Sequence, residues 1–187
     1  MAWDWQVFCE DTLDREVVQG CFGKGGDVTY LDWLLSAWGW TVSVSLLSLL
    51  LALLVGTLVG TVRTLEGRPW VVRLGNAWVE LFRNIPLLVQ LFLWYHVLPT
   101  IFPVLQGVPG FVLVVFALGL FTSARIAEQV RSGIETLPRG QRYAGMAMGF
   151  STFQSYRYIL LPSAFRIIVP PLTSETMNIF KNSSVAF

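Results

Sequence analysis

Charge is scarce in this sequence and unevenly distributed. Of the 187 residues, 13% are charged and 54% are apolar. Residues 33–62 carry no charge over 30 positions, and residues 84–124 carry none over 41. About 20 apolar residues already span a bilayer, and soluble domains do not contain uncharged runs of this length. The runs therefore exclude a soluble domain and indicate an all-α polytopic membrane protein.

Motifs for catalysis are also missing. The chain has no glycine-rich phosphate loop of the GxxxxGK[ST] type, no nucleophile–base set and no metal-binding cluster. The only histidine, His96, is interpreted as a satisfied polar group rather than as a ligand or proton carrier. We therefore expect no catalytic residues, no metal, no bound cofactor and no nucleic-acid partner.

Residues 1–32 form an acidic tail, with seven acids against Arg15 and Lys24. The tail has no cleavable signal pattern, because its start is acidic and no short apolar region follows. It contains both cysteines, Cys9 and Cys21, which could pair in a periplasmic tail, but two unpaired thiols are an equal alternative. The remaining residues, 33–187, are predicted to form the membrane domain.

The basic residues indicate how the membrane domain is oriented. Ten of the 13 lie in residues 63–83 and 125–166, and basic loops stay in the cytoplasm. Spans at about 35–62, 79–98 and 111–132 then fit an N-terminus outside the cytoplasm. A fourth span is predicted at 167–187, although its hydropathy is poor.

Two spacings predict how the spans pack. Gly56 and Gly60 form a GxxxG pattern that allows a close helix crossing, although glycine is also simply frequent in membrane helices. The alternating charges at 125–135 predict a ladder of ion pairs along one helix, which extends that helix beyond the membrane. The ladder residues are Arg125, Glu128, Arg131 and Glu135.

The stretch ELFRNIPLLVQ, residues 80–90, follows the first basic region. Glu80 and Arg83 are predicted to pair at a helix entrance, where Asn84 follows them. Pro86 removes a backbone hydrogen bond and should kink the second span. Snorkelling charges at the membrane surface are the alternative interpretation of this stretch.

Residues 139–162 are too polar to span a bilayer and predict two short helices. Pro138 stops the preceding helix, and a first helix runs from about Gln141 to Met148. Gly149 is placed where a helix C-cap needs positive φ. Ser151 and Gln154 form a capping box for a second helix, which is expected to end at Pro162.

Polar residues in the last stretch share a helix face. A buried charge in a membrane usually faces a partner or a water-filled pathway, and we prefer the pathway to simple solvation at the interface. The predicted pathway residues are Glu175, Asn178, Lys181 and Asn182.

Three motifs resemble those of ABC-importer permeases. Gly140-Gln141, Ala144, Ala147, Gly149 and Leu161-Pro162 resemble the cytoplasmic EAA loop, which in that family is the coupling helix on the ATP-hydrolysing subunit. The chain departs from the pattern at Tyr143, where the family has Glu, and at Gly145, where it has Ala. ELFRNIPLLVQ is similar to the polar-amino-acid subgroup, and PPLTSETMN with KNSSVA to glutamate/aspartate importer permeases.

The resemblance implies a type I permease fold in a bacterial inner membrane, truncated after the fourth span. It implies an ATP-binding cassette subunit that uses ATP and Mg, a second permease subunit, a periplasmic substrate-binding protein and surrounding lipid as partners. An ordinary amphipathic loop is the alternative for 139–162, and an ion-coupled carrier or an importer of glutamine, arginine or histidine is the alternative function. The residues implied to contact the ATPase are Gly140, Gln141, Tyr143, Ala144, Ala147, Met148, Gly149 and Pro162.

Overall fold

The computed structural model describes residues 5–13, 16–18, 21 and 28–184. It divides into two units, Met1–Ser43 and Val44–Phe187. The predicted acidic tail, 1–32, therefore lies partly outside the described residues, as do the last three residues of the fourth predicted span. The described elements are helices, apart from two isolated β-bridges in the first unit.

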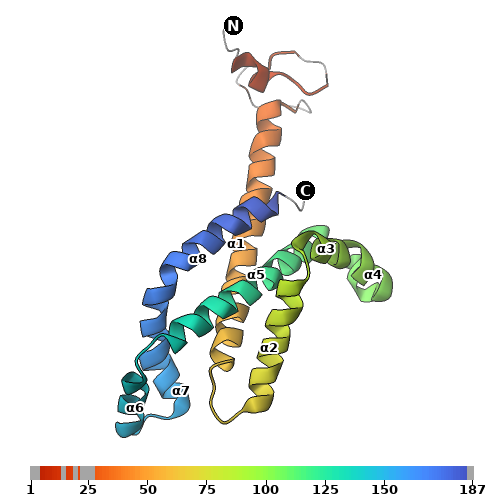
Figure 1. The fold of residues 1–187 in the computed structure, drawn as a ribbon. Coiled ribbons are helices and arrows are strands. Elements are labelled where there is room, and N and C mark those ends of the chain that lie inside the picture. The colour runs from red at the N-terminus through yellow and green to blue at the C-terminus, as the bar shows by residue number, and fades with distance from the viewer. Residues whose placement is uncertain (1–4, 14–15, 19–20, 22–27, 185–187) are drawn as a thin grey trace. The chain divides into compact units, whose positions relative to one another are not determined.

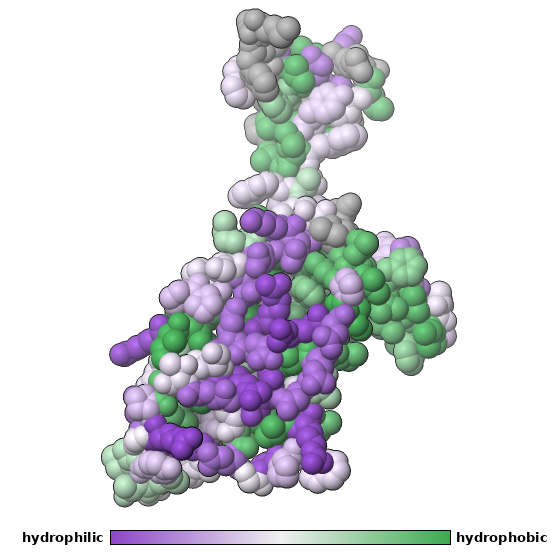
Figure 2. Space-filling view, viewed as in Figure 1, coloured by the Kyte–Doolittle hydropathy of each residue, from purple (hydrophilic) through white to green (hydrophobic). Residues whose placement is uncertain are grey.

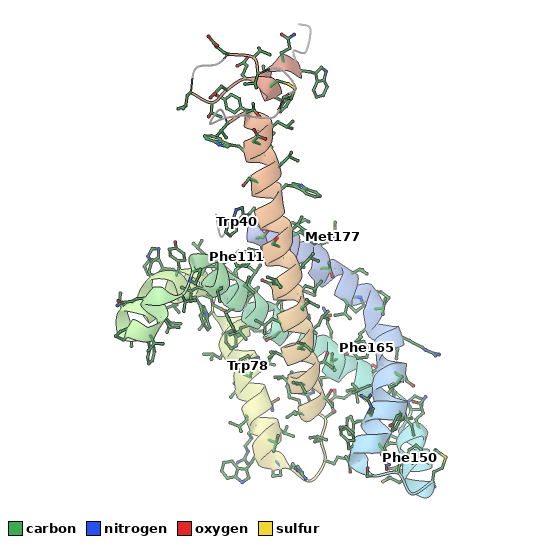
Figure 3. All side chains as sticks on the ribbon, turned by 180° about the vertical axis from the view of Figure 1, so that it is seen from behind. Trp40, Trp78, Phe111, Phe150, Phe165 and Met177 are labelled. Atoms are coloured by element: carbon green, nitrogen blue, oxygen red, sulfur yellow. A yellow bond between two sulfur atoms is a disulfide. The ribbon has the colours of Figure 1, made fainter. Side chains whose placement is uncertain are left out.

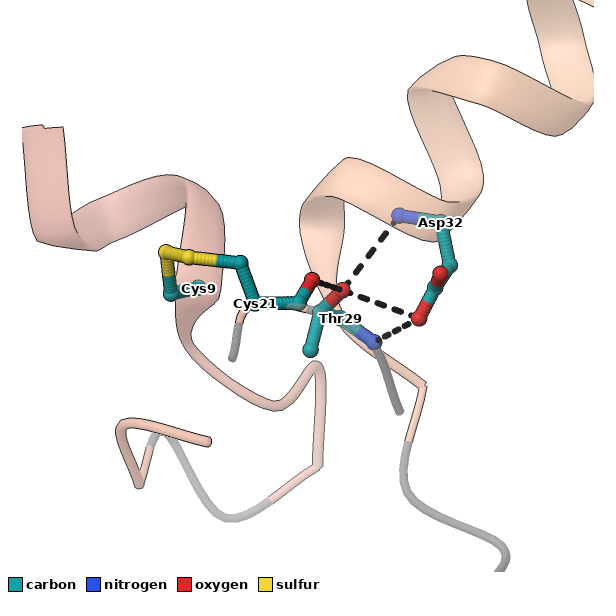
Figure 4. Close-up of a disulfide and its surroundings, with 4 residues drawn as sticks. All are labelled: Cys9, Cys21, Thr29 and Asp32. Atoms are coloured by element: carbon teal, nitrogen blue, oxygen red, sulfur yellow. Dashed lines mark hydrogen bonds between the residues drawn. A yellow bond between two sulfur atoms is a disulfide. The ribbon is translucent and has the colours of Figure 1, made fainter. Parts of the chain in front are cut away.

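The first unit contains a short 3-10 helix, η1 (Trp5–Cys9), and the start of α1 (Tyr30–Val62). Cys9 and Cys21, whose pairing the sequence leaves open, form a disulfide (Figure 4). Thr29 caps α1: its Oγ1 accepts the Asp32 N–H at 3.3 Å, while the Asp32 carboxylate accepts the Thr29 N–H at 3.2 Å. The Thr29 hydroxyl also lies 3.0 Å from the Cys21 carbonyl oxygen. The disulfide loop is thus joined directly to the first turn of α1.

The second unit is built from the rest of α1 and a series of further helices (Figure 1). In chain order these are α2 (Pro69–Asn84), α3 (Leu87–Phe92), the π-helix η2 (Leu93–Val97), α4 (Leu98–Ile101), the 3-10 helix η3 (Pro103–Gly107), α5 (Gly110–Glu135), α6 (Arg139–Ala147), α7 (Thr152–Ser155), the π-helix η4 (Tyr156–Leu160) and α8 (Leu161–Ser183).

Helix α5 is the centre of this unit and packs against α1, α2, α3 and α8. The predicted close crossing at the GxxxG pattern is confirmed. A Cβ on Gly56 would lie 2.8 Å from the Ser123 carbonyl oxygen, and one on Gly60 2.7 Å from that of Ala127. Because backbone cannot yield as a flexible side chain can, only glycine allows α1 and α5 to approach this closely.

The chain bends by 99° between α2 and the α3–α4 segment. The predicted kink at Pro86 is confirmed. Helix α2 begins at Pro69 and ends at Asn84, so residues 79–98 include the end of α2, the bend and the helices after it; their role as one span stays a prediction. Pro86 has φ −56° and ψ 143°, which is not helical. The buried Gln90 amide donates to the carbonyl oxygens of Phe82, at 2.8 Å, and Ile85, at 2.9 Å. It thereby satisfies carbonyls that the end of α2 leaves without helical partners.

Among the described helices, α1 and α5 are long and apolar enough to cross a membrane. The bent pair of α2 with α3–α4 makes a third if it counts as one span. The fourth predicted span, 167–187, falls largely in α8, which begins earlier, at Leu161. Its role as a span stays a prediction.

The predicted end of the second short helix at Pro162 is wrong. Helix α7 continues through η4 into α8, and Tyr156, Leu160 and Leu161 all have right-handed helical backbone. A π-helical turn shifts the hydrogen bonds from i+4 to i+5, so the missing N–H and the ring of Pro162 are accommodated without a break. Residues 152–183 therefore form one continuous helix, which contains a π-helical turn at η4.

Candidate functional site: an exposed helix and a charged cluster

Helix α6 and the turn after it form as the sequence predicts. Pro138 is the N-cap residue, so the helix starts at Arg139, two residues before the expected Gln141. Gly149 has φ +77°, the left-handed conformation that favours glycine at the end of a helix. The predicted capping box is confirmed: Ser151 Oγ accepts from the Gln154 N–H, and the Gln154 side chain accepts from the Ser151 N–H at 2.8 Å. Two short helices are thus held at a fixed angle.

Helix α6 turns its apolar side chains outward. Gly145 is buried, and a Cβ there would lie 3.0 Å from Ile159 Cδ1 and from Ser155 Oγ. This close contact presses one side of α6 onto α7 and η4. The opposite side leaves Tyr143 59%, Met146 54% and Met148 62% exposed. Such a surface is costly in water unless a partner covers it.

The predicted ATPase-contacting residues are mostly on this outer side. Tyr143, Ala144, Ala147 and Met148 are exposed, and Gly140 has open space around its Cα. Gln141 is half-buried. Pro162 is exposed in the first turn of α8, after η4. Met146, which is not among the predicted contacts, is also exposed and lies three residues after Tyr143, hence on the same helix face.

The α6–α7 segment (Arg139–Ser155) is linked to the turn between α1 and α2. The Tyr156 hydroxyl donates to the Thr64 carbonyl oxygen at 2.8 Å, and Arg142 pairs with Glu66. Arg142 also lies over the Tyr156 ring. A cleft of about 670 Å³ lies between this turn and α6, with Arg63, Arg139 and Met146 among its lining residues. Two segments that lie far apart in the sequence, the α1–α2 turn and the region around α6, are therefore connected here.

The predicted ladder along α5 is only partly correct. Arg131 pairs with Glu135 at 2.8 Å, as expected. Glu128 instead pairs with Arg63, in the turn directly after α1, and with Arg83 on α2, each at 3.1 Å. Arg63 is buried and also donates its Nε–H to Asn76 at 2.8 Å, so its charge requires the carboxylate. Glu128 pairs away from α5 because α5 packs against both α2, which carries Arg83, and α1, which ends one residue before Arg63.

The second misplaced member of the ladder is Arg125, which pairs with Glu175 on α8 at 3.1 Å. Glu175 is buried, and its Oε1 lies 3.4 Å from the Gln129 amide nitrogen. We call Arg63, Arg83, Arg125, Glu128 and Glu175 the arginine–glutamate cluster. Figure 2 shows hydrophilic side chains gathered over the part of the second unit where α5 and α8 lie, whereas the α3–α4 region is hydrophobic.

The other predicted pathway residues lie farther along α8. Asn178 and Asn182 are half-buried and Lys181 is exposed. The buried positions are Glu175, Ile179 and Ser183, which follow at steps of four. The predicted common face of Glu175, Asn178 and Asn182 is therefore only half inside the protein.

The structure separates the members of the predicted helix-entrance motif. Arg83 pairs with Glu128 rather than with Glu80, and Glu80, Asn84 and Pro86 are exposed. One further contact fixes α2 on α5. Trp78, labelled in Figure 3, donates its indole N–H to Ser123 Oγ at 3.2 Å. Within this stretch, Arg83 pairs with Glu128 of α5, and Gln90 bonds to the end of α2. No role is predicted for Gln90 from the sequence.

Comparison with known proteins places this geometry in context. The chain is 43% identical over 194 residues to the glutamate/aspartate import permease protein GltJ of Escherichia coli (strain K12), covering 98% of this chain and 74% of that protein. It is also 43% identical over 112 residues to the probable glutamine ABC transporter permease protein GlnM of Bacillus subtilis (strain 168), covering 60% of this chain and 50% of that protein.

A solved structure, titled as the crystal structure of an amino acid ABC transporter with histidines, superposes with a TM-score of 0.66 at 27% identity, covering 85% of this chain and 75% of that one. Residues 48–186 match the model of the family described as binding-protein-dependent transport system inner membrane component. The chain therefore belongs to the family of binding-protein-dependent transport system inner membrane components.

Proposed function

We propose that this protein is the permease subunit of an ATP-driven importer of amino acids, with glutamate and aspartate as its substrates. The substrates are those in the name of the relative that is 43% identical over 98% of this chain. The structural observation that carries the proposal is the outward apolar side of α6, whose opposite side packs on α7 and η4 at Gly145. A short apolar helix that fits a groove is a common way for a subunit to dock.

The partner at α6 is a separate ATP-binding cassette subunit, which binds ATP and Mg and hydrolyses ATP. ATP binding closes its dimer and moves α6. The continuous helix of residues 152–183 carries this movement to α8, and the Tyr156–Thr64 contact carries it to α1 and α2. A second permease subunit, identical or related, completes the pathway, because the ATPase acts as a dimer.

The N-terminus lies in the periplasm, where a loaded substrate-binding protein docks. Two observations support this orientation. The Cys9–Cys21 disulfide is typical of an oxidising compartment. The basic residues concentrate in 63–83 and 125–166, which fits a cytoplasmic position for the α1–α2 turn and the α6–α7 segment.

The test uses proteoliposomes that hold the full-length permease, its partner permease and the ATPase subunit. The periplasmic binding protein is added outside, loaded in turn with glutamate, aspartate, glutamine, arginine or histidine. We expect ATP hydrolysis to rise with glutamate and aspartate alone. Stimulation by another amino acid would change the substrate and keep the importer. No stimulation by any of them, in an assembled complex, would contradict the proposal.

Glutamine is the second candidate substrate, because a relative 43% identical over 60% of this chain is named as a probable glutamine permease. An ion-coupled carrier is the other alternative, with Glu175 and Lys181 handling ions. It predicts uptake without any ATPase subunit, driven by an ion gradient. It gives no role to the exposed side of α6.

A further inference from the structure

The arginine–glutamate cluster holds more positive than negative charge. Its three arginines pair with two glutamates, because Arg63 and Arg83 share Glu128, so the five residues together carry one net positive charge. Glu80, one turn before Arg83 on α2, makes no ion pair within the described part of the chain. An uncompensated charge among membrane helices is expensive, so it indicates a function.

Two of the three arginines keep part of their hydrogen-bonding capacity. Arg63 is enclosed, with 5% of its side chain exposed, whereas Arg83 is 54% and Arg125 is 43% exposed. Arg125 contacts Glu175 through Nε, and Arg83 contacts Glu128 through Nη1. Within the described residues, the two terminal Nη groups of Arg125 therefore remain for a ligand, and this is the edge with which guanidinium groups bind carboxylates.

A cleft adjoins these groups. It has a volume of about 410 Å³, within the range of small-ligand sites, and its charged lining residues are Arg83 and Glu128. Ile167, Ile168 and Pro171 of α8 give it an apolar wall. Gln129 also lines it and approaches Glu175, the partner of Arg125. Arg83 therefore lines the cleft directly, whereas Arg125 is linked to it through Glu175, which contacts the cleft residue Gln129.

We propose that Arg83 and Arg125 bind the carboxylates of an acidic amino acid on its way through the permease, and that the cluster's single extra positive charge selects for a substrate of net charge −1. This rests on the proposed function and assigns the specificity to residues of the permease itself. Glutamate and aspartate carry two carboxylates and one ammonium at neutral pH, so either would neutralise the cluster. Glutamine carries no net charge, and arginine would add a second positive charge.

The test measures binding of radiolabelled L-glutamate to the purified permease–ATPase complex in nanodiscs, without binding protein, at millimolar concentration. Arg125→Gln and Arg83→Gln each remove the extra charge and should weaken glutamate binding about tenfold or more, with little effect on competition by glutamine. Arg125→Lys keeps the charge and should recover part of the affinity. Glu175→Gln adds a positive charge and should tighten glutamate binding.

Arg131→Gln is the matched control, because Arg131 lies on the same helix but pairs with Glu135 outside the cluster. It should leave glutamate binding unchanged. Equal weakening by Arg131→Gln, equal loss of glutamine binding, or no binding of glutamate to the wild-type complex would each overturn the inference. ATPase stimulation by loaded binding protein is recorded on the same complexes. If it persists while the binding pattern fails, the proposed function stands and only this inference falls.

Discussion

The α6–α7 segment and the arginine–glutamate cluster have opposite relations to their surroundings. The segment exposes apolar side chains such as Tyr143 and Met146, although it is too polar as a whole to enter a membrane. The cluster encloses Arg63 and Glu175 between helices of the membrane domain. The first arrangement needs a partner outside the chain, whereas in the second each arginine already pairs with a glutamate of the chain itself. Mutations should therefore damage assembly in the first region and folding in the second.

The largest expected effect is on folding, from Glu128→Ala. It leaves the buried guanidinium of Arg63 without its carboxylate, which should lower the free energy of unfolding by about 3 kcal/mol. Thermal unfolding of the purified permease in detergent would measure the loss. Glu135→Ala is the control, because it breaks an exposed pair and should cost about 0.5 kcal/mol or less. Equal losses in both variants would show that the cluster is not a folding element.

A smaller effect on stability, with a large effect on coupling, is expected from Gly149→Val. A β-branched residue at φ +77° should cost about 1–2 kcal/mol and change the angle between α6 and α7. Substrate uptake per ATP hydrolysed in proteoliposomes should then fall sharply. Gly107→Val is the control for an added side chain, because Gly107 has open space around it and lies in η3, away from the α6–α7 segment and the α1–α2 turn; uptake per ATP should not change. Unaltered uptake in Gly149→Val would count against the docking role of the segment.

The smallest expected effect is from Met146→Ser. Since Met146 is 54% exposed, the free energy of unfolding should not change, whereas affinity for the ATPase subunit should fall roughly fivefold, or about 1 kcal/mol. Affinity can be measured by titrating the ATPase subunit onto permease in nanodiscs. Met177→Ser is a matched control on α8, at a methionine 63% exposed outside the segment. A comparable loss of affinity in the control would place the contact elsewhere.

The sequence predicts local features of this fold well. Pro138, Gly149 and the Ser151–Gln154 box each act within a few residues, and the structure forms all of them. The close crossing at Gly56 is also predicted, because a residue without a side chain lets the backbone of another helix approach. These signals depend on backbone chemistry that does not change with the rest of the chain.

The sequence does not predict which charges meet between helices. Arg125 and Glu128 lie at ladder spacing on α5, yet each pairs with a residue on another helix. Whether a charged residue pairs within its own helix or with a neighbouring one depends on how the helices are placed. The spacing of residues along one helix carries no information about that placement. The continuation of the helix through Pro162 is missed for a related reason, because a π-helical turn has no simple sequence signal.

The hydrogen bonds of Gln90 have a consequence for biosynthesis. An unpaired carbonyl in hydrocarbon costs several kcal/mol. A sharp bend in a membrane helix therefore ordinarily forms only when another helix supplies hydrogen bonds to its free carbonyls. Gln90 follows Ile85 by five residues and Phe82 by eight, and it satisfies both carbonyls from within the same stretch. As the nascent chain leaves the ribosome, the corner after α2 can therefore close as soon as Gln90 emerges, before α5 has emerged. The chain then enters the bilayer with the 99° bend between α2 and α3 already formed.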